Sequence, residues 1–391
     1  MHRSFISRNP SVLVFLSLLA LFTLVVTILS EGFGVGLIST SFVKVLGKTL
    51  CLALIAIAMD LIWGYTGILS LGHFAFFGLG GYMIGMWLMY ERTRQIVVHS
   101  LSEGVLPPTP EEITSGIGNQ IFGVVGSTDF PLIWAFADSL LLQLAFVVLV
   151  PGILALVFGW LAFRSRVTGV YLSILTQAMT LGLSLYLFQN ASGLRGNNGL
   201  SGLQNLPGVT APQSVVSLWF FWASALALAL GYLLVAWLVS GKFGSVIRGI
   251  RDNEARVRFL GYSVETYKLV VFTLTACISG IAGALYYPQA GIINPAEVAP
   301  IASIYLAVWV AIGGRGRLYG AVIGTAFVSL VSSWFTGGQA PDVSLGFYTV
   351  KWVDWWLVLL GLSFVLVTLY APNGMGGLID LLKRKRRDTE L

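Results

Sequence analysis

The polar side chains of this sequence are few, and their types suit hydrogen bonding to a neutral solute better than catalysis. Many lie in a glycine-broken stretch between two apolar runs, around Gly64 and Gly67. Glycine weakens a continuous helix, and transporters place broken helices where freed backbone groups can bind polar cargo. The alternative is a tight reverse turn at the membrane surface. The residues that we expect to line a substrate pathway are Gly64, Tyr65, Thr66, Gly67, Ser70, His73, Gln177, Asn197 and Asn198.

Polar residues within or beside the apolar runs are candidates for function, because embedding them in a membrane is costly. Asp60 and Asp354 lie near the ends of runs, where each carboxylate can reach water or an arginine. Gln177 lies in the middle of a run. Its amide suits contact with a neutral polar solute, although hydrogen bonding to a neighbouring helix is the commoner role of glutamine.

The sequence carries no pattern typical of a catalytic or metal site. His73 is the only histidine near an apolar interior, and no second imidazole or carboxylate cluster accompanies it, so we expect no metal. Gly47-Lys48-Thr49 ends like a phosphate-binding loop, but Phe42 stands where that motif requires glycine. We therefore expect no enzymatic activity, no cofactor and no ATP bound by this chain.

These polar groups must be positioned by membrane helices. The mean hydropathy is +0.84, with 56% hydrophobic and only 10% charged residues, which is typical of polytopic membrane proteins. The first run resembles a secretory signal, but its length and the lack of a cleavage site favour a retained helix. The runs predict an all-α protein with about ten transmembrane helices, near 11–30, 42–62, 73–90, 136–162, 167–188, 217–239, 269–289, 300–314, 318–336 and 351–371.

Charge distribution predicts the orientation. An even number of spans places both termini on one side, and most of the 23 basic residues lie on that side. The positive-inside rule makes it cytoplasmic and accounts for the +6 net charge without nucleic acid. We expect one transmembrane domain, residues 1–391, with a cytoplasmic loop at 240–268. An extracytoplasmic loop is expected at 91–135, whose apolar stretch rests on the membrane surface or packs on the helices.

Residues Lys242 to Lys268, here called the island, carry six basic and three acidic residues between two apolar runs. This charge density requires a solvated loop. From Ser245 to Leu260 apolar residues recur at helical spacing, with arginines between them. The pattern predicts a short amphipathic helix. Its apolar side either docks into a groove on a soluble partner, or the helix lies on anionic lipid headgroups.

The island pattern GxxxRxIRDNExRxxxLG, followed by Tyr267-Lys268 and an apolar run, resembles the cytoplasmic loop of ABC-importer permeases of the branched-chain amino acid and urea families. The resemblance covers nearly the whole chain from about Leu50 to Gly377. It implies that the loop docks on an ATPase subunit. The residues that match the family pattern there, and that we expect to couple to the ATPase, include Gly244, Arg248, Arg251, Asp252, Asn253, Glu254, Arg256 and Gly261.

Two segments resemble the urea branch of these families more than the amino-acid branch. They are DLIWGYTG, from Asp60 to Gly67, and GNNGL, from Gly196 to Leu200. The resemblance implies a urea permease subunit in a bacterial plasma membrane, a homologous second permease, two cytoplasmic ATPase subunits and an extracytoplasmic solute-binding protein. A branched-chain amino acid or another small amide is the alternative cargo. A passive urea channel would need no docking helix, and a secondary transporter would usually show charges within the membrane.

Overall fold

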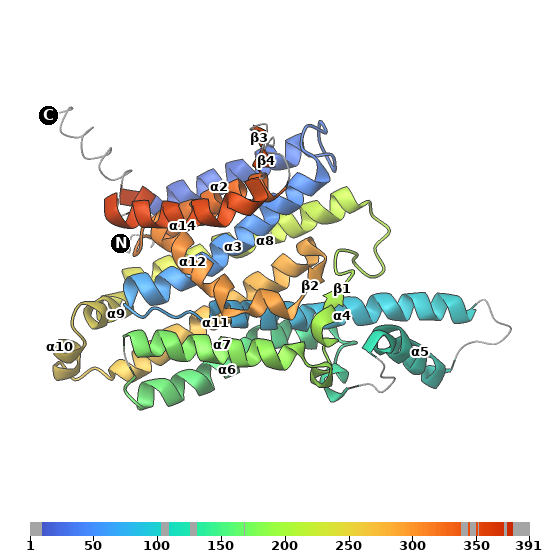
Figure 1. The fold of residues 1–391 in the computed structure, drawn as a ribbon, viewed down its shortest axis with the longest axis horizontal. Helices are drawn as coiled ribbons and strands as arrows, with labels where there is room; N and C mark the ends of the chain where they lie inside the picture. Colours follow the sequence, from blue (N-terminus) through green and yellow to red (C-terminus); the bar gives the residue numbers. More distant parts are fainter. Residues whose placement is uncertain are drawn as a thin grey trace, which may run out of the picture.

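Each apolar run that was predicted to span the membrane corresponds, to within about four residues at either end or to a helix that extends beyond the run, to a helix of the computed structural model (Figure 1). The structure describes residues 10–102, 109–125, 131–167, 169–337, 343–344, 349–350, 352–370 and 374–377. The helices that correspond to the ten runs are α2 (Pro10–Leu29), α3 (Thr40–Asp60), α4 (His73–Ser102), α6 (Leu140–Arg164), α7 (Val170–Phe188), α8 (Gln213–Ser240), α11 (Val264–Ala290), α12 (Pro300–Gly313), α13 (Leu318–Thr336) and α14 (Trp352–Tyr370).

The chain is an all-α polytopic membrane protein. Within the described residues, seven helices are long and apolar enough to cross a membrane, and the shorter apolar helices α12 and α14 accompany them. In the part of the chain that the structure describes, the strands form two short antiparallel pairs: β1 (Leu200–Ser201) with β2 (Ile292–Ile293), and β3 (Val343–Ser344) with β4 (Thr349–Val350). Helices suit this environment because they satisfy their own backbone hydrogen bonds without water.

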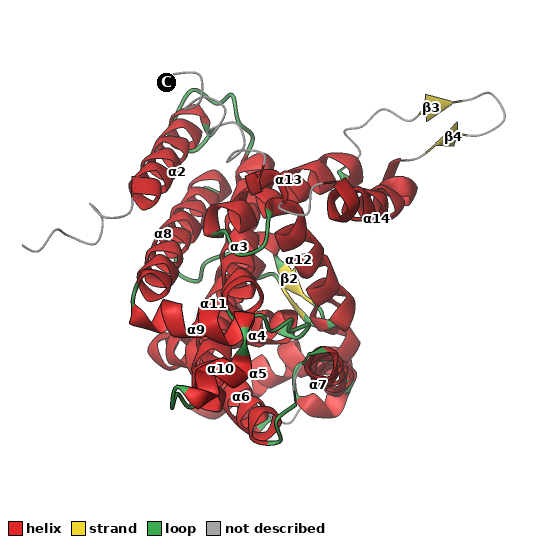
Figure 2. Cartoon of the chain, turned by 90° about the vertical axis from the view of Figure 1, so that its left-hand side faces the viewer, coloured by secondary structure: helices red, strands yellow, loops and turns green. Residues whose placement is uncertain are grey.

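Helix α3 lies in the middle of the bundle, against α8, α11 and α13 (Figure 2). From Leu50 to Asp60 every one of its side chains is buried. Beside it, α4 and α11 approach so closely that a Cβ on Gly80 would collide with the backbone of Gly280. Small residues permit such contacts, through which membrane helices associate. Any interruption of helix α3 or α4 is therefore surrounded by tightly packed helices.

The stretch 91–135, predicted as an outer loop, is largely helical where the structure describes it. Helix α4 continues to Ser102, and α5 (Pro110–Phe122) follows. Trp134 packs edge-on against Phe122, with ring centroids 5.4 Å apart, and donates a hydrogen bond to the carbonyl of Gly193 at 2.7 Å. The apolar end of this stretch thus packs on its own chain. Residues 103–108 and 126–130 lie outside the described residues.

The island lies at one end of the bundle and α5 at the other (Figure 1). The connection between α6 and α7, with its two arginines, lies at the island end as well. This grouping is the one that the charge distribution predicts for a cytoplasmic face. The predicted cytoplasmic placement of both termini concerns residues 1–9 and 378–391, which lie outside the described residues.

Candidate functional site

The stretch between α3 and α4, residues 61–72, is here called the helix break. It begins with a π-helical turn, η1 (Leu61–Tyr65), and continues without regular helix to His73. Gly67 adopts a φ of +79°, a conformation open mainly to glycine. At Gly64 a Cβ would collide with the side chain of Asp60 and the backbone of Gly316. Both glycines are therefore required by the geometry, and the sequence prediction of an interrupted helix is correct.

Hydroxyl groups of two other helices satisfy the backbone of the helix break. On α7, Ser173 donates to the carbonyl of Leu69 at 2.6 Å, and Thr176 accepts from the amide of Leu71 at 3.0 Å. On α12, the hydroxyl of Ser303 accepts from the amide of Phe74 at 3.1 Å. Unpaired backbone groups are costly in a membrane, so these hydroxyls hold the broken chain in place. None of them was singled out from the sequence.

Two predicted pathway residues have unpaired polar atoms at the break. Within the described part of the chain, the hydroxyl of Ser70 and both imidazole nitrogens of His73 have no hydrogen-bond partner, and both side chains are fully buried. Thr66 instead donates to the carbonyl of Leu61 at 3.2 Å, so its hydroxyl is already used. A hydroxyl and an imidazole without partners in a buried position have donor and acceptor capacity that this conformation does not use.

The structure does not bring all predicted pathway residues to the break. Gln177 is half-buried on α7, one residue after Thr176. Asn197 and Asn198 are exposed on a 3₁₀ turn that follows the far end of α7. Because Ser173 and Phe188 are 15 residues apart on α7, this turn is about 20 Å away from the break along the helix axis. There the carbonyl of Asn197 accepts from the side chain of Asn294 at 2.9 Å.

A half-buried pair of opposite charges between α3 and the turn after α11 was missed by the sequence analysis. Lys48 is half-buried on α3, and the half-buried Glu297 lies on the 3₁₀ turn η6 (Pro295–Val298), close enough for the two charges to attract. The aromatic side chain of Tyr287 lies beside Glu297. The signal was a lysine inside an otherwise apolar run, which is itself a functional indication.

The island forms two short helices rather than the single predicted one. Helix α9 (Lys242–Asp252) ends at Asn253, whose side chain accepts from the amide of Arg256 at 3.0 Å and so caps α10 (Glu254–Phe259). Asparagine is a preferred N-cap residue, so the signal for this interruption was present in the sequence. Gly261, with a φ of +89°, then turns the chain toward α11.

The apolar face of α9 and α10 is buried against the same chain. Ile247, Ile250 and Val257 are each less than 7% exposed, and the last two pack on Val264 of α11. In this conformation that face is not available to a partner. Beyond it, Phe259 is 91% exposed, Leu260 71% and Tyr262 44%. These three residues, here called the apolar tip, present large hydrophobic side chains at the end of the island.

Several predicted coupling residues shape the island from within. Arg248 donates a hydrogen bond to the carbonyl of Val239 at 3.2 Å. At Gly244, a Cβ would collide with the backbone of Val239. Glu254 accepts from Lys268 at 2.6 Å and from Arg258 at 2.9 Å. Asp252 and Arg256, on either side of Glu254 in the sequence, are exposed. The island is thus a small, internally bonded unit.

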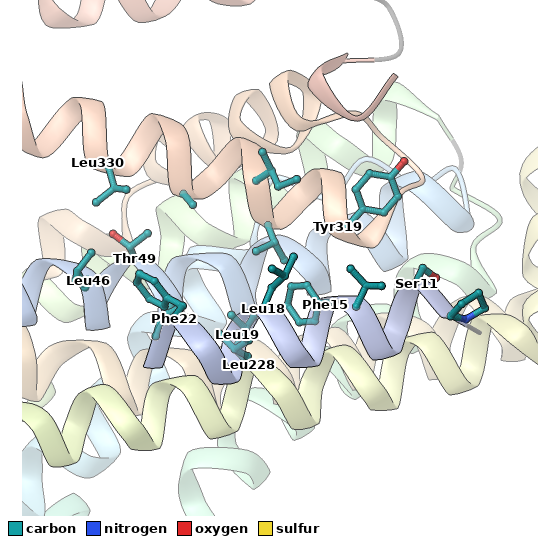
Figure 3. Close-up of a pocket in the computed structure, with 16 residues that line it drawn as sticks. Ser11, Phe15, Leu18, Leu19, Phe22, Leu46, Thr49, Leu228, Tyr319 and Leu330 are labelled. Carbon is teal, nitrogen blue, oxygen red and sulfur yellow. The ribbon is translucent and has the colours of Figure 1, made fainter. Parts of the chain in front are cut away.

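An apolar groove of about 650 Å³ lies between α2, α3, α8 and α13 (Figure 3). Phe15, Leu19 and Phe22 of α2 line it, with Leu46 of α3 on the opposite wall. Polar cargo needs hydrogen-bond partners on the surface that holds it, so this groove is no candidate for a polar solute. Among the described residues no group of three or more His, Cys, Asp or Glu side chains is arranged to hold a metal ion.

Comparison with known proteins places these features in context. Residues 41–368 match the family model described as "Branched-chain amino acid transport system / permease component". The chain is 22% identical over 361 residues to the high-affinity branched-chain amino acid transport system permease protein LivM of Salmonella typhimurium, covering 87% of this chain and 71% of that relative. It is 29% identical over 204 residues to the autoinducer 2 import system permease protein LsrC of Escherichia coli, covering 50% of this chain and 58% of that relative. No solved structure matches the chain significantly.

Proposed function

This chain belongs to the family of branched-chain amino acid transport system permease components, and on that premise we propose that it forms the membrane pathway of an ATP-driven importer for urea. It is a permease subunit of an ABC importer, located in a membrane that it crosses several times. The partners would be a homologous second permease, two ATPase subunits and an extracytoplasmic solute-binding protein. The membrane would be the plasma membrane of a bacterium.

The observation that carries the proposal is the island with its apolar tip. A water-facing loop that exposes Phe259 and Leu260 needs a cover, and the arginines around them favour an acidic rim on the partner. A passive channel has no use for such a surface. The ATPase would bind the tip, while the buried inner face of α9 and α10 keeps the island attached to α11.

The mechanism would be alternating access. Closure of the ATPase pair moves the island, and the island moves the helices joined to it. The helix break, with the unpaired groups of Ser70 and His73, would then open to one side of the membrane at a time. No ATP site is needed on this chain, because the partner subunits would bind and hydrolyse the nucleotide.

The cargo assignment rests on the two segments that resemble urea permeases, Asp60 to Gly67 and Gly196 to Leu200. Urea is uncharged and offers amide donors and one carbonyl acceptor, so hydroxyl, imidazole and backbone groups suffice to bind it. The similarity to LivM supports the second candidate, a branched-chain amino acid. For that cargo the opposite charges of Lys48 and Glu297 would suit a carboxylate and an ammonium group.

Uptake by the complete importer in proteoliposomes tests the cargo. Labelled urea is offered with the matching solute-binding protein and ATP, in the presence of excess unlabelled urea or leucine. We expect urea alone to compete. Accumulation of labelled leucine that urea does not reduce would assign the importer to amino acids. Uptake without ATP would assign the chain to the channel class.

A further inference from the structure

Arg251, in the last turn of α9, reaches from the island to the helix break. Its Nη1 donates a hydrogen bond to the carbonyl of Gly64 at 2.8 Å, and its Nε pairs with Asp252 at 3.0 Å. Its Cγ lies 2.9 Å from the position that a Cβ on Gly67 would occupy. The side chain thus touches the π-helical turn itself, at Gly64, and the chain just after it, at Gly67. An arginine expected to face an ATPase therefore makes hydrogen bonds to its own chain, while 37% of its side chain stays exposed.

The turn between α12 and α13 holds the same π-helical turn from another side. The amide of Gly316 donates to the carboxylate of Asp60 at 2.6 Å, and the guanidinium of Arg315 lies 5.3 Å from the ring centroid of Trp63. Arg251 Nη1 is 3.7 Å from the place of a Cβ on Gly316. The π-helical turn is therefore held between the island and this turn, at the end of the bundle that carries the island.

The held element is one that can change its conformation. A π-helical turn accommodates one residue more than an α-helical turn and is intrinsically unfavourable. A charged donor on a carbonyl that the break leaves free makes a strong hydrogen bond, which stabilises this register. Residues 66–72 follow directly and are attached to α7 through the hydroxyls of Ser173 and Thr176, while Ser303 of α12 binds the amide of Phe74 just beyond them. A shift at Gly64 thus reaches the buried Ser70 and His73 through a short stretch of chain.

We propose that Arg251 is the positioning residue that transmits movement of the island to the helix break. Its bond to Gly64 fixes the π-helical register of residues 61–65 in the conformation described here. When the island moves, the guanidinium leaves Gly64, the turn changes register, and the segment with Ser70 and His73 is displaced. The proposal rests on the proposed function, because the ATPases supply the movement.

The experiment uses the complete importer with Arg251→Met, which keeps the aliphatic stem and removes every donor, and Arg251→Lys, which keeps one donor. Arg166→Met is the matched control, since Arg166 is exposed on the α6–α7 connection at the same end. Uptake and ATP hydrolysis are measured together. We expect Arg251→Met to lower the solute carried per ATP about tenfold, while the ATPases still co-purify and hydrolyse ATP. Arg251→Lys should recover part of the loss, and the control should behave as wild type.

Hydrogen exchange of the same variants separates this proposal from the proposed function. Amides of residues 61–72 should exchange about tenfold faster in Arg251→Met, with α11 unchanged. Normal coupling, or unchanged exchange in this segment, would overturn the role of Arg251. Loss of ATPase binding would also overturn it, because Arg251 would then be a docking residue. If the wild-type importer carries neither solute, the proposed function fails, and the exchange measurement still decides the role of Arg251.

Discussion

Lys268 donates a hydrogen bond to Glu254 at 2.6 Å, and its side chain is only 8% exposed. This contact joins the start of α10 to the first turns of α11, so it fixes the island to a helix of the bundle. A hydrogen bond to a charged group contributes about 1.5–3 kcal/mol. The ion pair therefore holds α10 in a defined position against α11, so that movement of α10 can be transmitted to that helix.

We expect Glu254→Lys to uncouple ATP hydrolysis from uptake, because two ammonium groups would then face each other where one of them is buried. The charge swap Glu254→Lys with Lys268→Glu should restore uptake in part. Restoration is incomplete because Arg258, which also binds Glu254 at 2.9 Å, does not change its charge. Uptake and ATPase rates of the reconstituted importer measure both effects. Equal activity of the single variant and wild type would contradict this role.

The apolar tip is expected to bind the ATPase subunit. Phe259→Ser and Leu260→Ser should leave the fold intact, since these side chains are 91% and 71% exposed. A residue at the centre of an interface contributes about 2 kcal/mol or more, so each change should weaken ATPase binding about 30-fold. The measurement is titration of the purified ATPase onto the permease in nanodiscs. Leu132→Ser is the control, because Leu132 is 92% exposed and lies beside α5.

The helices of this fold are predictable from the sequence because a membrane-spanning helix is a local property. Length and apolarity decide it, and α2 and α8 begin and end within about four residues of the predicted runs. The division of the island into α9 and α10 depends on one capping residue, Asn253. A prediction made from the spacing of apolar residues alone overlooks it. What covers the apolar face of the island could not be read from the pattern, because the contact is made by Val264 of another helix.

The helix break is also visible in the sequence, since Gly64 and Gly67 mark it directly. The side chains that hold the broken segment in place are not visible in the sequence. Ser173 and Ser303 are separated by 104 and 229 residues from the backbone groups that they bind. Ser173 belongs to a row of buried hydroxyl residues on α7, with Thr176, Thr180 and Ser184, whose helical spacing marks a face but not the backbone group that it binds. Ser303 has no such pattern around it on α12. Lys48 and Glu297 likewise come from distant segments, so the lysine alone could be noticed in the sequence but its pairing with Glu297 could not.

A substitution at Gly67 tests the contact between the break and the island without removing a charge. Gly67→Ala places a methyl group on a residue with a φ of +79° and within 2.9 Å of Arg251 Cγ. The backbone strain alone is about 1–2 kcal/mol. We expect uptake to fall by about tenfold or more, with a lowered Tm of the purified permease. Gly361→Ala on α14, where no atom lies within 4 Å, should leave both unchanged.

Lys48 and Glu297 allow a test of whether this half-buried pair of charges serves the solute or only the fold. Removing one partner of a buried pair leaves an uncompensated charge, whereas replacing both with neutral groups of similar size is often tolerated. We therefore expect Lys48→Met and Glu297→Gln each to lower the Tm, and the double variant to recover most of it. If the pair contacts the solute, uptake stays low in the double variant despite the restored Tm. Full recovery of uptake would assign the pair to stability alone.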